Sequence, residues 1–290
     1  MITKPMLAGK VEDMAAVKYP VLVTPKLDGI RCLKINGKAV TRTFKPIPNI
    51  YIRAWVERNV PDGMDGELMC EGTFQEATGG VMRESGEPRF TYYVFDYVKD
   101  DLNKSYAGRI ADLIASGING NCRVVIPITV TNEAGLKAME EQFIDDGYEG
   151  LMMRTPDSPY KCGRSTEREG YLLKMKRFED DEAIVIAINE QMHNENEAEK
   201  DAFGRTKRST AKAGLVGSGV AGGFIVRCKK FRNDFGIGMG DSAMAKEVWA
   251  NREKYIGAIV KFKYQPIGST SDAPRFPGFV GFRDKRDISK

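Results

Sequence analysis

Histidine, clustered cysteine and long apolar runs are what this sequence lacks. Its single histidine, His193, lies in a polar run, which excludes mechanisms that need several histidines. The five cysteines are odd in number, widely spaced and never arranged as C-x-x-C, a pattern that argues against a disulfide framework or a zinc cluster and favours buried thiols. No apolar stretch is long enough to cross a bilayer, and residues 1–6 are not followed by the apolar core of a secretory signal. We therefore expect a cytoplasmic protein without a membrane partner.

What is present is an ordinary globular composition. The chain has 290 residues, of which 42% are hydrophobic and 29% charged, and its net charge of +4 is mild. This length exceeds the usual single-domain size, so two compact units are expected. The acidic residues 179–182 precede a fresh strand-like run, and we place the boundary there, with domains at residues 1–179 and 180–290.

Apolar periodicity predicts a mixed α+β fold for the first domain. Strand-like runs fall at residues 21–24, 30–35, 38–42, 66–70, 89–98, 124–130 and 150–154, and helical spacing falls at residues 50–59, 107–115 and 132–145. Asn36 and Gly37 separate two of the strand-like runs, which strongly indicates a type I′ hairpin. Asn132 is placed to cap the last helix.

The second domain is rich in strand-like runs, at residues 183–188, 222–228, 258–264 and 279–283, with a helix near residues 242–249. About five short strands and one helix in such a length fit a small closed barrel such as an OB-fold. The sequence thus predicts an α+β domain followed by a β-barrel.

Lys26 stands where a nucleophile is chemically suitable. It follows the strand-like run at residues 21–24 and precedes Asp28-Gly29, a turn at which the backbone can approach a ligand closely. A lysine amine attacks phosphorus only when it is deprotonated, so it needs partial desolvation or nearby cations. Arg31 and a bound metal ion could supply that positive field. Alone, a K-x-D-G match is weak evidence, because so short a pattern also arises by chance.

Acidic and aromatic positions follow in order. Asp65 and Glu67 are two residues apart, so both point to one face of a strand and could hold a ribose or a divalent ion; the alternative is a charged turn before an edge strand. Residues 92–97 alternate aromatics along a strand, which is either plain core or a stacking face for a purine. Glu149 precedes a buried-looking strand, where metal coordination is chemically sensible.

Groups of cations complete the set. Lys174 and Lys176 can emerge on one face of a strand toward phosphates, although lysine pairs are also common on solvated edge strands. Near the C-terminus, Arg275, Arg283 and Lys285 could reach a leaving group. A basic run in a stretch of small residues is either a solvated loop or a phosphate-binding arm. That run consists of Arg205, Lys207, Arg208 and Lys212.

This ordered set resembles the covalent nucleotidyltransferase superfamily, and most closely the small ATP-dependent DNA ligases of viruses and phages, over nearly the whole chain. The resemblance implies a nucleotidyltransferase (adenylation) domain followed by an OB-fold domain. It also implies that Lys26 attacks the α-phosphate of ATP, that AMP then passes to the 5′-phosphate of a nick, and that the 3′-hydroxyl displaces AMP. The implied cofactors are ATP and Mg²⁺, and the implied partner is nicked double-stranded DNA, encircled by a monomer.

The resemblance also implies roles for individual residues. In the nucleotide site it places Asp28 in the nucleophile motif, Thr24 at the adenine edge, Phe95 stacked on adenine, Glu67 at ribose and metal, Glu149 at the metal, and Lys174 and Lys176 at the α-phosphate. Arg31 and Arg42 are similar to residues that contact the nucleotide or the nick 5′-phosphate, and Arg164 to a nick-phosphate arginine. Arg283 and Lys285 resemble the pyrophosphate-orienting motif of the OB domain. The basic run looks like part of the DNA-gripping latch of small viral ligases, here at about residues 194–219.

The same superfamily leaves alternatives open. An mRNA capping guanylyltransferase would lack the latch, and an RNA ligase generally carries an unrelated C-terminal domain. An NAD-dependent ligase needs a further N-terminal domain and usually a four-cysteine zinc site, for which this sequence has neither the length before Lys26 nor the clustered cysteines. A nucleic-acid binder with a decayed catalytic domain predicts damage to at least one motif, and none is visible. We expect a DNA ligase.

Overall fold

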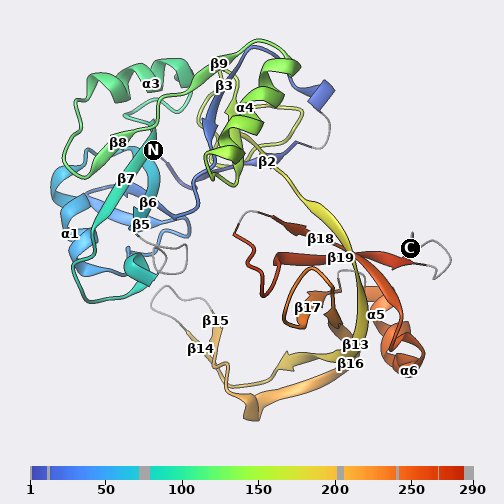
Figure 1. The fold of residues 1–290 in the computed structure, drawn as a ribbon. Helices are drawn as coiled ribbons and strands as arrows, with labels where there is room; N and C mark the ends of the chain where they lie inside the picture. Colours follow the sequence, from blue (N-terminus) through green and yellow to red (C-terminus); the bar gives the residue numbers. More distant parts are fainter. Residues whose placement is uncertain are drawn as a thin grey trace. The chain divides into compact units, whose positions relative to one another are not determined.

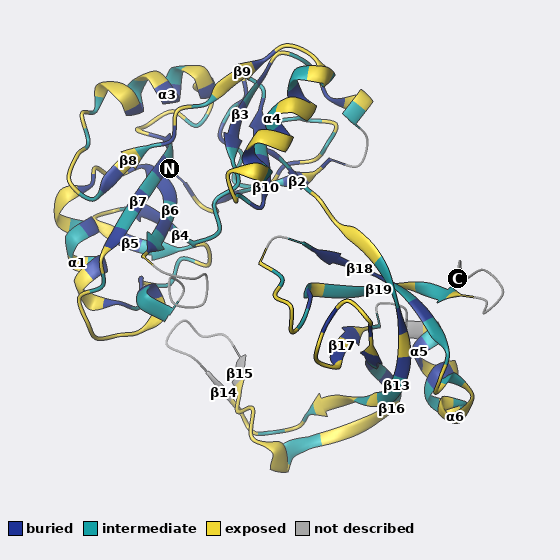
Figure 2. Cartoon of the chain, in the orientation of Figure 1, coloured by how far each residue is buried: buried dark blue, intermediate teal, exposed yellow. Residues whose placement is uncertain are grey.

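The computed structural model describes residues 2–11, 14–71, 79–200, 206–239, 242–266 and 268–283. The chain divides into two units, Met1–Lys176 and Arg177–Lys290 (Figure 1). In both units the buried residues concentrate in the strands, whereas the helices expose their outer faces (Figure 2). None of the helices in the described part of the chain is long and apolar enough to span a membrane.

Two sheets form the frame of the first unit. Within its described residues, one five-stranded sheet has the order β2-β12-β10-β3-β9 and the other has the order β5-β4-β6-β7-β8. The first consists of β2 (Gly9–Lys10), β12 (Leu173–Lys176), β10 (Gly150–Arg154), β3 (Val21–Pro25) and β9 (Ile128–Val130). The second consists of β5 (Lys38–Thr41), β4 (Ile30–Ile35), β6 (Met64–Cys70), β7 (Phe90–Tyr97) and β8 (Cys122–Val124). A short parallel pair joins β1 (Met6–Leu7) to β11 (Gly163–Arg164).

Helices cover both sheets, because each presents an apolar stripe at helical spacing. The second sheet packs against α1 (Ile50–Asn59) and α3 (Tyr106–Ala115), and the first against α4 (Glu133–Asp145). Each helix begins after a residue whose side chain accepts a hydrogen bond from the backbone N–H three positions on. These N-caps are Asn49, Ser105 and Asn132, so the predicted cap at Asn132 is confirmed.

The turn at Asn36-Gly37 joins β4 to β5. Both residues have positive φ angles, 49° and 74°, which confirms the predicted type I′ hairpin. The tight turn fixes the register of β4, whose other edge pairs with β6. In that register Arg31 lies opposite Glu67, so two of the predicted site residues meet across adjacent strands.

The strand expected at residues 124–130 is wrong in one respect, because the chain breaks there. β8 ends at Val124 and pairs with β7, whereas β9 starts at Ile128 and pairs with β3 in the other sheet. Pro127 lies in the gap and has no N–H to donate to a ladder. The segment therefore crosses between the two sheets instead of continuing along one.

The second unit is a closed barrel with the strand order β13-β16-β17-β19-β18, which confirms the predicted OB-fold. Its strands are β13 (Glu179–Asn194), β16 (Leu215–Arg227), β17 (Phe235–Gly238), β18 (Ile259–Gln265) and β19 (Arg275–Arg283). The core is apolar and aromatic, with Phe224 and Phe262 fully buried. α5 (Ser242–Ala250) closes it by burying Val248. β17 is the barrel strand that the sequence did not indicate.

An arm, described at residues 194–200 and 206–215, extends from the barrel strands β13 and β16 (Figure 1). Within it, β14 (Ala198–Lys200) pairs with β15 (Thr206–Arg208). The Asn196 side chain ties the two sides together by donating to the carbonyls of Ser209 and Ala211, at 3.0 and 2.9 Å. The arm overlaps the expected latch. Arg208 and Lys212 are exposed on it, whereas Arg205 and the side chain of Lys207 lie outside the described residues.

Candidate active site

A cavity of about 720 Å³ opens in the first unit and gathers most of the residues that the sequence predicts for the site. Its walls come from the ends of strands in both sheets and from the turns that follow them. The predicted residues that line it are Thr24, Lys26, Arg31, Arg42, Glu67, Phe95, Arg164, Lys174 and Lys176. Its volume falls within the range of small-molecule sites.

Glu149 holds the amines of two of these lysines. Lys26 directly follows β3, and its N–H donates to the carbonyl of Gly150 at 2.9 Å. The Lys26 ammonium forms an ion pair with Oε2 of Glu149, and Nζ of Lys176 lies 3.0 Å from Oε1. Burial would raise the pKa of Glu149, but the charges of Lys26 and Lys176 hold it below its ordinary value. Glu149 therefore stays ionised and directs both amines.

Glycines allow this close approach. Gly150 follows Glu149 with a φ of 141°, and a Cβ at that position would lie 2.2 Å from the carbonyl oxygen of Met175. In the turn after Lys26, a Cβ on Gly29 would lie 2.4 Å from the carbonyl oxygen of Leu68. A side chain at either position would push these strand ends apart, so both glycines are needed to bring Lys26 beside Glu149 and β6.

Lys174 adds a further amine to the same wall. It alternates with Lys176 along β12, so both side chains reach one face, as the spacing predicts. Burial lowers the pKa of Lys174, and the positive charges of Lys176 and Lys26 lower it further. Such a cluster of cations is relieved by an anion, which makes this wall suited to phosphate.

Arg31 and Phe95 form another part of the cavity lining. The Arg31 guanidinium lies 4.7 Å from the centre of the Phe95 ring and makes two hydrogen bonds to Asp65, at 2.5 and 2.6 Å. Asp65 is fully buried and does not line the cavity. The expectation that Asp65 and Glu67 serve a ligand together is therefore wrong for Asp65, because Arg31 occupies its carboxylate.

Glu67 is a carboxylate that titrates near neutrality. Burial raises its pKa to about 7, against the opposing effects of Arg31, Lys26 and a hydrogen bond from the backbone of Gly29. Because burial raises the pKa in the folded state, the stability of the protein falls as the pH rises above the ordinary value of 4.5, and this loss is complete once the pH passes about 7. The side chain therefore favours a positive charge placed beside it.

Glu67→Gln should consequently change stability in a pH-dependent way. We expect its free energy of unfolding, relative to the unmodified protein, to rise by roughly 1–2 kcal/mol between pH 4.5 and pH 8. Denaturant titrations across this range measure it, with the exposed Glu71→Gln as the matched control. A difference that is the same at both pH values would contradict a raised pKa at Glu67.

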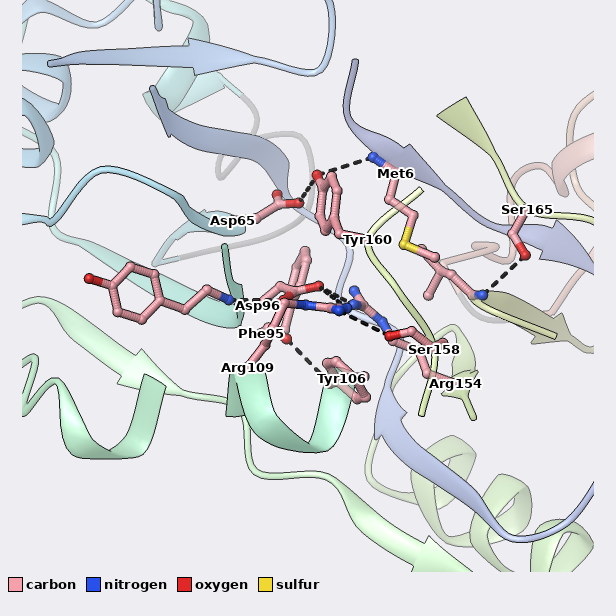
Figure 3. A network of polar contacts seen from close by, with 12 residues as sticks. Met6, Asp65, Phe95, Asp96, Tyr106, Arg109, Arg154, Ser158, Tyr160 and Ser165 are labelled. Atoms are coloured by element: carbon pink, nitrogen blue, oxygen red, sulfur yellow. Dashed lines mark hydrogen bonds and ion pairs between the residues drawn. The ribbon is translucent and has the colours of Figure 1, made fainter. Parts of the chain in front are cut away.

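Asp96 anchors a buried network behind the cavity (Figure 3). Nε of Arg109 lies 2.7 Å from Oδ1 of Asp96, and Arg154 donates to Oδ2. The guanidinium of Arg154 lies 4.3 Å from the centre of the Tyr106 ring, and Arg154 and Tyr106 both line the cavity. Burial would raise the pKa of Asp96, but Arg154 and Arg109 hold it below its ordinary value. Sequence reasoning missed this network, although a charged residue inside an aromatic strand-like run was available as an indication.

The remaining predicted residues lie in other settings. Arg42 is exposed at the rim of the cavity, and Arg164 donates to the carbonyl of Ala8 at 2.7 Å. Asp28 does not line the cavity. In the second unit, Nε of Arg283 lies 3.2 Å from Oε1 of Glu182, and Lys285 lies outside the described residues.

A divalent cation is compatible with this donor set. No three His, Cys, Asp or Glu side chains in the described ranges gather into a preformed metal cage. Mg²⁺ does not require one, since it is commonly held by one or two carboxylates together with water and substrate phosphates. Glu67 and Glu149 supply two carboxylates near the cationic wall, and the raised pKa of Glu67 is of the kind that a nearby cation reverses.

The two-sheet domain with its strand-end lysine, followed by a closed five-stranded barrel, is a nucleotidyltransferase domain followed by an OB-fold domain. Residues 5–176 match the family model of the ATP dependent DNA ligase domain, and residues 216–283 match that of the DNA ligase OB-like domain. The chain belongs to the ATP-dependent DNA ligase family, and its enzyme class is DNA ligase.

Relatives agree with this assignment. The solved DNA ligase-adenylate of Chlorella virus is 36% identical, with 98% of this chain and all of that chain covered and a TM-score of 0.58. A solved Lig E DNA ligase is 26% identical, with 98% and 100% covered and a TM-score of 0.70. The DNA ligase of Haemophilus influenzae is 25% identical over 272 residues, which are 91% of this chain and 87% of that protein.

Proposed function

We propose that this ligase seals 3′-hydroxyl/5′-phosphate nicks in duplex DNA through AMP carried on Lys26. The observation that supports it most is the placement of the Lys26 amine on the cation-lined wall of a nucleotide-sized cavity, paired with Glu149. In the first step the amine forms an N–P bond to the α-phosphate of ATP while pyrophosphate leaves with the bond electrons. The AMP then moves to the DNA 5′-phosphate and frees the lysine. The 3′-hydroxyl finally attacks that phosphate and AMP leaves.

Each cavity wall has a proposed task in these steps. Phe95 offers a ring for adenine to stack on, with Thr24 beside the adenine edge and Glu67 at the ribose. Lys174 and Lys176 neutralise the α-phosphate as charge develops on it. Because Glu149 already binds the Lys26 ammonium, it orients the amine and is the nearest base for its proton.

Mg²⁺, when bound by Glu67 and Glu149 together with phosphate oxygens, would neutralise charge on the phosphates. Arg31 and Arg42, at the cavity, are proposed to engage the nucleotide or the nick 5′-phosphate, and Arg164 the nick phosphates. Arg283 and Lys285 of the OB domain are proposed to orient pyrophosphate during lysine adenylation. We propose that one copy of the chain encircles the duplex and that the arm serves as the latch.

The reaction is tested by incubating a labelled nicked duplex with Mg²⁺ and ATP, GTP or NAD in separate tubes. Sealing in the ATP tube alone is the expected result. Sealing with GTP or NAD would contradict the assigned cofactor. If no tube seals the nick, the proposed reaction on DNA is wrong, and the same tubes with a nicked RNA duplex test the alternative.

The arm should contribute mainly electrostatic binding to DNA. Each phosphate contact contributes about 0.9 to the slope of log K against log salt concentration, so the double variant Arg208→Ala/Lys212→Ala should lower that slope by about 1–2. Nick-binding titrations at several salt concentrations measure it, with Lys246→Ala on α5 as an exposed control. Lysine adenylation without DNA should not change. An unaltered slope would remove Arg208 and Lys212 from the DNA interface.

A further inference from the structure

A closed ring of hydrogen bonds holds Arg31. Figure 3 shows the part of it that runs from Asp65 through Tyr160 to Met6. The Tyr160 hydroxyl donates to Oδ2 of Asp65 at 2.7 Å and accepts from the backbone N–H of Met6 at 3.1 Å. Asp65 accepts two hydrogen bonds from Arg31, and Nη2 of Arg31 also donates to the carbonyl of Met6 at 3.3 Å. The ring thus joins β4, β6 and β1 to the segment that precedes β11.

Of these four residues, Arg31 alone lines the cavity. Met6 and Asp65 are fully buried, and Tyr160 is only 2% exposed. Burial raises the pKa of Tyr160 well above its ordinary value, and the charge of Asp65 adds to that effect, so the hydroxyl keeps its proton and donates. Tyr160 is therefore the donor in its hydrogen bond to Asp65, and its oxygen is the acceptor for the N–H of Met6.

An arginine side chain has many rotamers, and holding it in one of them costs conformational entropy. The hydrogen bonds of the ring offset that cost. Asp65 can hold the guanidinium with both oxygens only if its carboxylate plane is fixed. The Tyr160 hydroxyl fixes that plane, and the N-terminal strand in turn holds the hydroxyl. Without the hydroxyl, the Met6 N–H loses its acceptor and Oδ2 of Asp65 loses one of the donors that fix the carboxylate plane.

We propose that Tyr160 is a positioning residue for Arg31, acting through Asp65 and anchored on the backbone of Met6. Tyr160 does not touch the ligand. It keeps the guanidinium over the Phe95 ring, where the cavity would present it to the phosphates of the nucleotide or of the nick. The inference rests on the proposed function in so far as Arg31 serves one of those phosphates.

Tyr160→Phe is the test, and Tyr92→Phe is its matched control. Tyr92 is also fully buried, and its hydroxyl donates to the carbonyl of Cys32 at 2.9 Å, so both variants lose one buried hydroxyl but only one loses it from the ring. Two steps are measured separately: AMP transfer from ATP to the protein, and sealing of a nick that already carries AMP.

We expect the rate of one step to fall about tenfold in Tyr160→Phe, and this should be the step that Arg31→Ala also slows. A tenfold lower rate corresponds to an activation free energy that is higher by about 1.4 kcal/mol, which is the size of one lost hydrogen bond. Tyr92→Phe should leave both steps within about twofold of the unmodified protein. In the Arg31→Ala background, Tyr160→Phe should cause no further loss, because nothing is left to position. Arg31→Lys serves as a second background that keeps a charge beside Asp65.

A full tenfold loss that persists in both Arg31 backgrounds would overturn the proposal, as would equal losses in Tyr160→Phe and Tyr92→Phe. If the unmodified chain performs neither step, the proposed function is wrong, but the positioning role of Tyr160 can still be tested. The ring is then judged by denaturant unfolding of Tyr160→Phe, Arg31→Lys and the double variant. Additive losses of stability would refute the coupling, and a double variant no less stable than Arg31→Lys would support it.

Discussion

Lys26→Ala should take up no AMP from ATP, yet should still seal a nick whose 5′-phosphate already carries AMP. Only the first chemical step consumes the lysine amine, because the last step is an attack by the DNA 3′-hydroxyl. Loss of the nucleophile removes the covalent route altogether, so labelling with radioactive ATP should fall at least about a thousandfold. Sealing of the adenylated nick should fall far less, since Glu149 and Lys176 still form their ion pair.

Lys18→Ala is a suitable control, because Lys18 is an exposed lysine of the same domain. It should match the unmodified protein in both assays. Labelling that survives in Lys26→Ala would mean that another amine of the cavity wall, Lys174 or Lys176, carries the AMP. An equal loss of both activities would mean that Lys26 supports the shape of the site and is not its nucleophile.

Much of this site could be predicted because its residues stand at strand ends or alternate along strands. Lys174 and Lys176 face one side of β12 as a period of two requires, and Lys26 follows the end of β3 at the turn. What spacing could not show is which strands are neighbours. β10 pairs with both β3 and β12, and this places Glu149 between amines that lie 123 and 27 residues away in sequence.

The buried partners were harder to predict. Asp96 and Arg154 are polar residues in strand-like runs, and Asp65 directly precedes one. Sequence alone does not tell an exposed charge from one that a distant partner neutralises. Tyr160 lies outside every run that was singled out. Each is buried only because its partner arrives from another element, so the pairing is a property of the tertiary fold.

Barrel and arm illustrate the same limit. Short apolar runs indicated strands at residues 183–188 and 222–228, where one face of each is in the core. Beyond the barrel, β13 and β16 continue with exposed residues on both faces, and no apolar alternation marks them. Backbone hydrogen bonds between β13 and β16 hold these exposed parts together. Such hydrogen bonds do not require particular side chains, so the sequence does not indicate them. The break at Pro127 did carry an indication, since proline is confined to strand edges and ends.

Asp96→Asn should be the most destabilising of the substitutions considered, at roughly 3–5 kcal/mol, because it leaves buried guanidinium groups without their counter-charge. Arg109 and Asp96 are fully buried and Arg154 is nearly so. An amide offers one acceptor oxygen where the carboxylate offers two, so the donors of the two arginines cannot both be satisfied. Chemical denaturation followed by the fluorescence of Trp55, in a Trp249→Phe background, reports the first domain alone.

Asp112→Asn is the matched control, since Asp112 forms a 2.5 Å ion pair with Lys104 at the surface of the same domain and should contribute no more than about 1 kcal/mol.

The pH dependence of the stability difference provides a second test. Because the pKa of Asp96 is lowered in the folded state, its stabilisation is present above its ordinary pKa and is lost as the pH falls through the folded value. The stability difference between Asp96→Asn and the unmodified protein should therefore be constant from pH 6 to pH 8 and should narrow in acid. If instead the two substitutions cost the same, water must reach Arg109 and Arg154 in the variant, and the network behind the cavity would not depend on the charge of Asp96.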